Sequence, residues 1–151
     1  MTRTTARELA LRLCFSLSES GERPEELLET VFDPEYYETL KSEDEIFAEY
    51  PDEAQMRYIK RLVAGVGEHS YELDGYIEKY ARGWKFARIS RTAVAILKTA
   101  MYEVMYMSDE VPVGAAVNEA VELAKKYEEP ETVPFINGIL GSFSREEAAD
   151  K

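Results

Sequence analysis

The stretch RISRTAVAILKTAMYEVMY, residues 88–106, decides the fold because it has the pattern of a helix buried on most of its sides. Apolar side chains take the positions Ala93, Val94, Ile96, Leu97, Ala100, Met101, Val104, Met105 and Met107. At about 100° per residue these positions cover well over half of a helix circumference. Ser90 is a residue type that commonly caps a helix start. We therefore predict a central helix over residues 91–107, with other helices packed around it.

The remaining chain shows helical spacing of apolar residues nearly throughout, and no strict apolar alternation is long enough to favour a strand. Further helices are predicted over residues 5–18, 24–32, 52–80 with a break near 67–72, 112–129 and 132–146. The first has capping-box spacing between Thr5 and Glu8, and Gly21 is a typical helix terminator. These signals together predict an all-α fold, a single compact bundle of about seven helices.

Residues 33–53 interrupt this pattern with a dense acidic stretch that includes SEDE at 42–45. Tyrosine, phenylalanine and isoleucine are scattered among the charges, so we expect an excursion that is partly ordered at best and holds a short helix. The length of 151 residues is close to that of one ordinary domain. We therefore predict one domain over residues 1–151, with the acidic excursion at about 33–53.

Composition excludes several classes of function. No apolar run approaches the roughly 18 residues that span a membrane, and the N-terminus lacks the apolar core of a signal peptide, so a cytoplasmic protein is expected. One cysteine, Cys14, and one histidine, His69, are too few for most catalytic triads and zinc sites. The acidic residues lack the spacing of a calcium loop. We predict a protein that is no enzyme and uses no metal or cofactor.

The net charge of −12 argues against nucleic-acid binding, since Lys and Arg contacts to phosphates supply much of that affinity. However, residues 19–53 hold fourteen acidic residues against Arg23 and Lys41, so the remainder of the chain is neutral in sum. An RNA site elsewhere on the surface is therefore compatible with the composition.

The first helix carries a pattern that suits single-stranded RNA. Arg3, Arg7, Leu11 and Phe15 recur at four-residue intervals and form a stripe beside the predicted core face. Arginine pairs with phosphates in a fork geometry, and an aromatic ring can stack on an unpaired base. The alternative is that a neighbouring helix covers Leu11 and Phe15 and that the arginines only solvate the helix start. From these residues alone the alternative is the more economical interpretation.

Several segments resemble the NusB family of bacterial transcription antitermination factors. They are TARELALRLCFSL at 5–17, the 88–106 stretch, AVNEAVELAKKY at 116–127 and PFINGIL at 134–140. In the family, the first helix and the start of the last helix contact the boxA element of ribosomal RNA leaders. The resemblance implies that the RNA-binding residues are Arg3, Arg7, Phe15, Lys125, Lys126, Phe135 and Asn137.

The resemblance also implies protein partners. NusB proteins act with a NusE-type small-subunit ribosomal protein, and the pair helps the RNA polymerase antitermination complex to resist termination. The family's partner surface lies on the central and following helices, where we expect Lys98, Glu103 and Glu119 to be exposed and to bind the partner. For Glu103, Asn118 and Glu119, hydrogen bonding between helices of the bundle is the alternative role.

The chain departs from the family pattern at Thr4 and Thr5, where relatives have consecutive arginines, and at Ala93, where a glutamate linked to the partner is common. These departures, with the charge of −12, favour one alternative: a protein-only adaptor or homodimeric scaffold with reduced or lost RNA binding. The same fold also forms the RNA-binding module of a ribosomal RNA methyltransferase, but a chain of this length is not expected to hold the additional cofactor domain.

Overall fold

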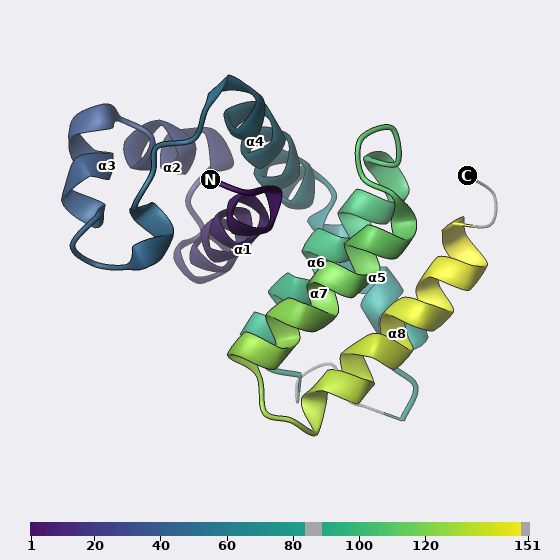
Figure 1. Cartoon of the computed structure of the whole chain (residues 1–151). Helices are drawn as coiled ribbons and strands as arrows, with labels where there is room; N and C mark the ends of the chain where they lie inside the picture. The colour runs from purple at the N-terminus through teal and green to yellow at the C-terminus, as the bar shows by residue number, and fades with distance from the viewer. Residues whose placement is uncertain (84–88, 149–151) are drawn as a thin grey trace. The chain divides into compact units, whose positions relative to one another are not determined.

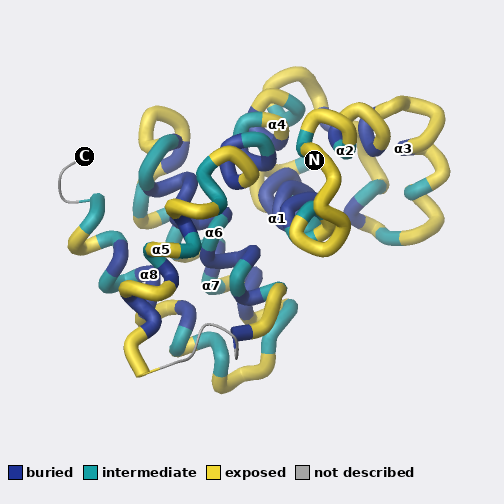
Figure 2. The backbone as a smooth tube through the Cα atoms, turned by 180° about the vertical axis from the view of Figure 1, so that it is seen from behind, coloured by how far each residue is buried: buried dark blue, intermediate teal, exposed yellow. Residues whose placement is uncertain are grey.

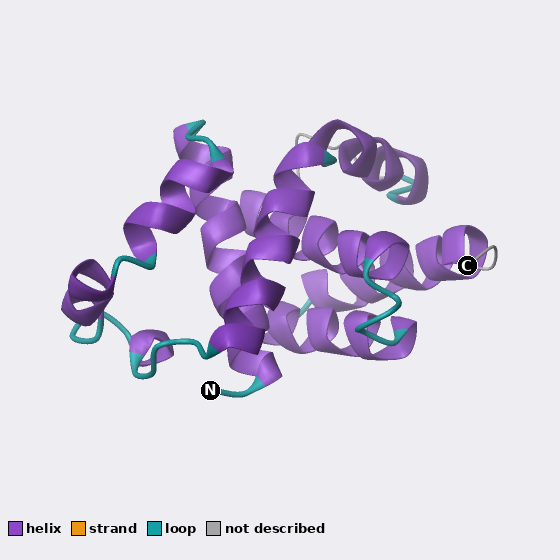
Figure 3. Ribbon diagram, turned by 90° about the horizontal axis from the view of Figure 1, so that it is seen from above, coloured by secondary structure: helices purple, strands orange, loops and turns teal. Residues whose placement is uncertain are grey.

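The computed structural model describes residues 1–83 and 89–148, and within these ranges every regular element is a helix and none is a strand (Figure 3). Arg88, the first residue of the 88–106 stretch, lies outside the described residues. The eight α-helices found here correspond to the predicted seven plus the short helix expected in the acidic segment. The prediction of an all-α fold is confirmed.

The chain divides into two compact units, Met1–Gly67 and Glu68–Lys151. Elements of the first unit are α1 (Arg3–Ser20), α2 (Pro24–Val31), α3 (Pro34–Leu40), the short 3-10 helix η1 (Glu45–Phe47) and α4 (Glu53–Glu68), which ends at the unit boundary. The second unit contains α5 (Ser70–Tyr80), α6 (Arg91–Tyr106), α7 (Val113–Tyr127) and α8 (Thr132–Glu147) (Figure 1). That the two units fold as one cooperative domain stays a prediction, which denaturation followed separately in each unit would test.

Local signals set the ends of the helices in the first unit. The hydroxyl of Thr2 accepts a hydrogen bond from the backbone amide of Thr5 at 3.0 Å, so α1 begins earlier than the predicted Thr5. The predicted cap at Thr5, with Glu8 three residues later, is therefore wrong, and Thr2 is the cap. Gly21 ends the helix with a φ of 70°, and Pro24 begins α2. These last two predictions are confirmed.

The acidic segment is more ordered than the sequence predicts. Three aromatic rings of the segment and Phe32 just before it form a cluster. Tyr37 is at its centre, 5.0 Å from Tyr50, 5.6 Å from Phe47 and 5.9 Å from Phe32 between ring centroids. Tyr37 is 1% exposed, and its hydroxyl donates to the Glu49 carbonyl at 2.7 Å. The acidic residues of α3, Glu35 and Glu38, are exposed, and most of this helix carries the exposed colour (Figure 2). Aromatic packing therefore orders a segment whose charge density suggests disorder.

The second unit is built around α6. This helix packs against α5, α7 and α8, and α8 also packs against α5 and α7 (Figure 1). Ser90 caps α6 by accepting a hydrogen bond from the Ala93 amide at 3.0 Å, as predicted. Ile96, Leu97, Met101 and Val104 have no exposed surface. The central position predicted for this helix is confirmed within the unit.

Candidate nucleic-acid interface

The start of α1 carries two arginines that share one aromatic ring. The guanidinium carbon of Arg3 lies 4.0 Å from the centroid of Tyr58 on α4, and that of Arg7 lies 5.6 Å from the same centroid. Arg3 is exposed, whereas Arg7 is only 4% exposed and Tyr58 is fully buried. The two predicted RNA-binding arginines thus differ in access: Arg3 reaches solvent and Arg7 lies within the structure.

The stripe predicted on this helix is therefore not an open face. Leu11, two turns after Arg3, is 2% exposed, and Phe15 at the far end of the stripe is half-buried. Residues 6–11 are all buried, which means that α1 is enclosed on nearly every side along these turns. Apolar spacing cannot reveal this enclosure, since the polar Arg7 and Glu8 are buried as well. For Leu11, the alternative of a covered side chain is correct.

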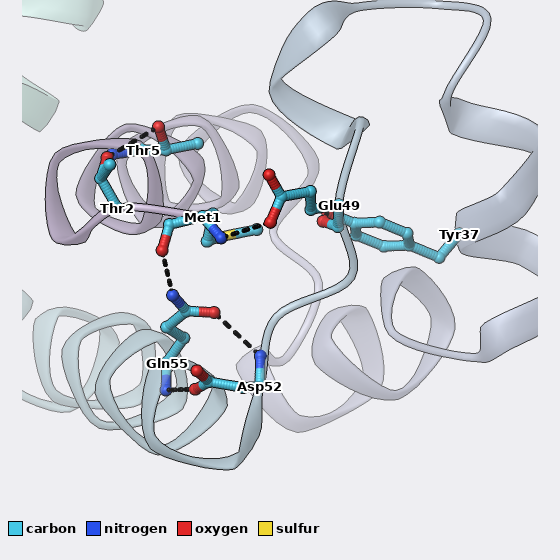
Figure 4. A network of polar contacts seen from close by, with 7 residues as sticks. All are labelled: Met1, Thr2, Thr5, Tyr37, Glu49, Asp52 and Gln55. Carbon is cyan, nitrogen blue, oxygen red and sulfur yellow. Dashed lines mark hydrogen bonds and ion pairs between the residues drawn. The ribbon is translucent and has the colours of Figure 1, made fainter.

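Polar contacts hold the start of α1 to the start of α4 (Figure 4). Asp52 and Gln55 form a reciprocal capping box at α4: the Gln55 amide donates to Asp52 Oδ1 at 2.8 Å, and Gln55 Oε1 accepts from the Asp52 amide at 2.9 Å. The side-chain nitrogen of the same Gln55 donates to the carbonyl of Met1. The amino group of Met1 also lies 2.6 Å from Glu49 Oε2. The backbone that precedes Arg3 is therefore anchored.

Tyr58 and Gln55 are not among the residues predicted from sequence. Tyr58 occupies one of the apolar positions of α4, so its spacing resembles that of an ordinary core residue. Asp52 and Gln55 do carry a readable signal, because Asp followed three residues later by Gln is a capping-box pattern. The pattern predicts a helix start, but it gives no indication that Gln55 also contacts α1.

The remaining predicted RNA-binding residues belong to the second unit. Lys125 and Lys126 are exposed in the last turn of α7, where Lys125 Nζ lies 3.0 Å from Glu122 Oε1 and Lys126 Nζ lies 5.6 Å from the Tyr127 ring centroid. In the first turns of α8, Phe135 is half-buried and Asn137 is exposed. Glu128, in the connection between these helices, accepts a hydrogen bond from the hydroxyl of Ser90. These four residues gather at the connection between α7 and α8.

Two of the three predicted partner-binding residues lack the expected exposure. Glu103 is 1% exposed, and the side chain of Lys98 is 14% exposed. Lys98 Nζ lies 2.7 Å from Asp74 Oδ1 and donates to the Ser70 hydroxyl at 2.8 Å, so Lys98 is directed at α5. Glu119 is half-buried and Asn118 is exposed. The expectation failed because α6 is surrounded by three helices, and its charged positions are covered along with its apolar ones.

Two properties bear on other classes of function. Within residues 1–83 and 89–148, no group of three or more histidine, cysteine, aspartate or glutamate side chains is placed to hold a metal ion, and Cys14 is 7% exposed. None of the helices in these ranges has the length and apolar character required to cross a membrane. The predicted RNA-binding residues in the described ranges provide exposed cations, half-buried aromatic rings and one exposed amide. These groups are suited to binding.

Comparison with known proteins supports a common ancestry along almost the whole chain. A model described as the NusB family matches residues 4–145. The transcription antitermination protein NusB of Clostridium botulinum is 36% identical over 141 residues, which is 93% of this chain and 98% of that protein. The protein of the same name from Acetivibrio thermocellus is 39% identical over 141 residues, covering 93% of this chain and 87% of the relative.

A solved structure shares the fold. The structure of T. maritima NusB superposes with a TM-score of 0.71 at 23% sequence identity, and the match covers 98% of this chain and 94% of that one. At this identity the likeness concerns the arrangement of helices alone.

Proposed function

Because the chain belongs to the NusB family, we propose that it acts in transcription antitermination by binding single-stranded boxA-type RNA together with a NusE-type ribosomal protein. In this role the protein catalyses no reaction and works in the cytoplasm, on nascent transcripts. It joins the RNA polymerase antitermination complex through its partner.

One observation carries the RNA part of the proposal: Arg3 is exposed at an anchored helix start, with its guanidinium carbon 4.0 Å from the centroid of the Tyr58 ring. An ordered, exposed guanidinium suits the recognition of a phosphate. On the same helix Phe15 offers part of a ring to a base. We assign Arg7 a contribution through its positive charge near the same ring, since its side chain is buried.

We assign a second group of contacts to the connection between α7 and α8. Lys125 and Lys126 would neutralise phosphates, Phe135 would stack on a base, and Asn137 would read a base edge with its exposed amide. Glu128, Glu129 and Glu131 occupy the same connection and oppose the lysines. A modest affinity for RNA, increased by the partner, is the expected result.

Of the three predicted partner-binding residues, we keep only Glu119 as a direct contact with the partner. Glu119 is half-buried and keeps surface through which a NusE-type protein can bind. Lys98 would contribute indirectly, by joining α6 to α5. Glu103 would contribute as a buried residue of α6.

Fluorescence anisotropy of a labelled boxA-type RNA tests this proposal. The RNA is titrated with the protein alone and with its partner, at two salt concentrations, beside an RNA of scrambled sequence. We expect preference for boxA, tighter binding with the partner, and a slope of log affinity against log salt of roughly −1.5 to −3 for two to four cations. Arg3→Ala should weaken RNA binding. Arg23→Ala is the control: it removes an exposed positive charge at the N-cap of α2 and should leave RNA binding unchanged.

A protein-only adaptor or homodimeric scaffold is the second candidate. It is favoured by the net charge of −12 and by the burial of Arg7, which leaves few accessible cations on α1. Capture of the partner with no binding of either RNA would support this candidate and reject the RNA roles. Concentration-dependent mass in solution would then distinguish the homodimer from the adaptor.

A further inference from the structure

We propose that Tyr58 is a positioning residue for RNA binding: its ring orders the guanidinium of Arg3 so that the donor edges of Arg3 face the RNA. This inference rests on the proposed function and adds to it a residue that does not itself touch RNA. The observation behind it is the pair of arginine contacts to one buried ring, at 4.0 Å for Arg3 and 5.6 Å for Arg7.

The three side chains differ in exposure, and this difference shows which of them can reach RNA. Tyr58 has no exposed surface, Arg7 is 4% exposed, and Arg3 is exposed. Arg3 therefore forms the outer layer over a ring that belongs to α4, with Arg7 close to the same ring. A buried ring has a fixed orientation, so it can fix the plane of a guanidinium that would otherwise sample many rotamers.

The chemistry of arginine makes such a stack compatible with phosphate binding. A guanidinium uses its planar face to stack on an aromatic ring, while its N–H donors point outward in the plane of the group. These donors match the paired oxygens of a phosphate. Ordering before binding also reduces the side-chain entropy that is lost when the complex forms. Tyr58 would thus raise affinity through Arg3 without any RNA contact.

The backbone next to Arg3 is held by the same helix, which strengthens the assignment. Gln55 lies three residues before Tyr58, so the two side chains project from neighbouring positions on one side of α4. The Gln55 side chain is fixed by the capping box with Asp52 and donates to the Met1 carbonyl (Figure 4). One helix thus fixes the backbone leading to Arg3 and also the Arg3 side chain.

The test compares Tyr58→Met, which removes the ring but keeps apolar bulk, with Tyr58→Phe, which keeps the ring. Arg3→Ala and the double variant Arg3→Ala/Tyr58→Met complete a cycle. RNA affinity is measured by anisotropy over a range of salt. We expect Tyr58→Met to bind boxA-type RNA roughly 5- to 10-fold more weakly, with a salt slope shallower by about 0.7, the loss of one phosphate contact to a single strand. Tyr58→Phe should stay within about twofold of the wild type, since its ring remains available for stacking.

The double variant separates positioning from general structural damage. If Tyr58 acts through Arg3, adding Tyr58→Met to Arg3→Ala weakens RNA binding no further. Additive losses, or a Tyr58→Met protein with unchanged affinity and slope, would overturn the positioning role while leaving RNA binding by the wild type intact. A wild type that binds no RNA would instead reject the proposed function, and this inference with it.

A second measurement avoids dependence on the stability of Tyr58→Met. In NMR spectra of the wild type and of Tyr58→Phe, the side-chain N–H of Arg3 should be shifted upfield by the ring beneath it, and it should shift again when RNA is added. An Arg3 signal at its ordinary position in both proteins would show that the ring does not order the guanidinium, and would reject the proposal even if Tyr58→Met failed to fold.

Discussion

The ammonium nitrogen of Lys98 lies 2.7 Å from Oδ1 of Asp74, so a charge expected to face a partner instead joins α6 to α5. The side chains are 14% and 39% exposed, and Ser70 accepts a further hydrogen bond from the same ammonium. This ion pair is half-covered. Its contribution to stability should therefore lie between that of an exposed pair, which is small, and the larger loss that follows when a buried pair is broken.

We expect Lys98→Met to lower the free energy of unfolding by about 1–2 kcal/mol, because it leaves Asp74 with its charge and without this cation. Urea denaturation measures the change. Lys125→Met is the matched control, since its pair with Glu122 is exposed, and it should cost at most about 0.5 kcal/mol. Unchanged stability of Lys98→Met together with lost partner binding would instead assign Lys98 a direct role at the partner interface.

The cap of α1 provides a second prediction. Thr2→Ala should lower stability by about 1 kcal/mol, because the amide of Thr5 loses its 3.0 Å acceptor at the helix start. Thr2→Ser keeps a hydroxyl there and should retain most of that stability. Thermal unfolding followed by circular dichroism compares the three proteins. Equal losses in both variants would show that the Thr2 hydroxyl is not the effective cap.

The helix ends show what can be read from sequence and what cannot. Gly21, Pro24 and Ser90 mark ends through their own backbone preferences or side-chain groups, and each is where the sequence predicts. The choice of Thr2 and not Thr5 as the cap of α1 is different, since only Thr5 has the glutamate three positions later that marks a capping box. Tertiary contacts select the earlier start: Gln55 of α4 holds the Met1 carbonyl.

The candidate site was predictable to a lesser degree, because exposure depends on which other helix covers a residue. Arg3 and Arg7 are equivalent in a helical pattern, but Tyr58 stacks with Arg3 near the surface and lies beside a buried Arg7. Glu103 is buried for the same reason, in a helix enclosed by its neighbours. The assignment of RNA and a ribosomal protein as partners came from the family resemblance, since no local pattern specifies them.

Three tyrosines make stability sensitive to alkaline pH. Burial, followed by the nearby Tyr50 and Glu49, raises the pKa of Tyr37 to about 12. Burial, followed by the hydrogen bond to Glu147, raises the pKa of Tyr80 to about 12. The hydrogen bond to Glu72, followed by burial, raises the pKa of Tyr106 to about 12. In the unfolded chain these hydroxyls ionise near pH 10. Unfolding therefore releases protons above that pH.

We expect the stabilising contribution of these tyrosines to be complete below pH 10 and to decline as the pH rises towards 12. Urea denaturation at several alkaline pH values measures the decline, and tyrosinate absorbance shows whether ionisation accompanies unfolding. Tyr106→Phe cannot ionise and should flatten the pH dependence. A free energy of unfolding that stays constant between pH 10 and 12 would contradict this expectation.

Asp44 links the acidic segment to α1. Its Oδ2 lies 2.8 Å from Nη1 of Arg12, and its Oδ1 accepts from the Ile46 amide at 3.1 Å to cap η1. Arg12→Met removes the link and keeps the cap, so it should promote local opening around residues 42–45. A partly exposed pair of this kind is worth about 0.5–1 kcal/mol, which corresponds to roughly two- to fivefold faster cleavage when the segment opens and closes faster than the protease cuts it.

Limited digestion with a glutamate-specific protease, followed by mass spectrometry, measures cleavage after Glu43 and Glu45. Lys41→Met is the matched control, because Lys41 pairs with Glu38 across one exposed turn and does not link the segment to α1. Its cleavage rate should equal that of the wild type. If Arg12→Met were cleaved no faster than Lys41→Met, the aromatic cluster around Tyr37 would be sufficient to hold the segment, and the ion pair to Asp44 would have no measurable effect on its order.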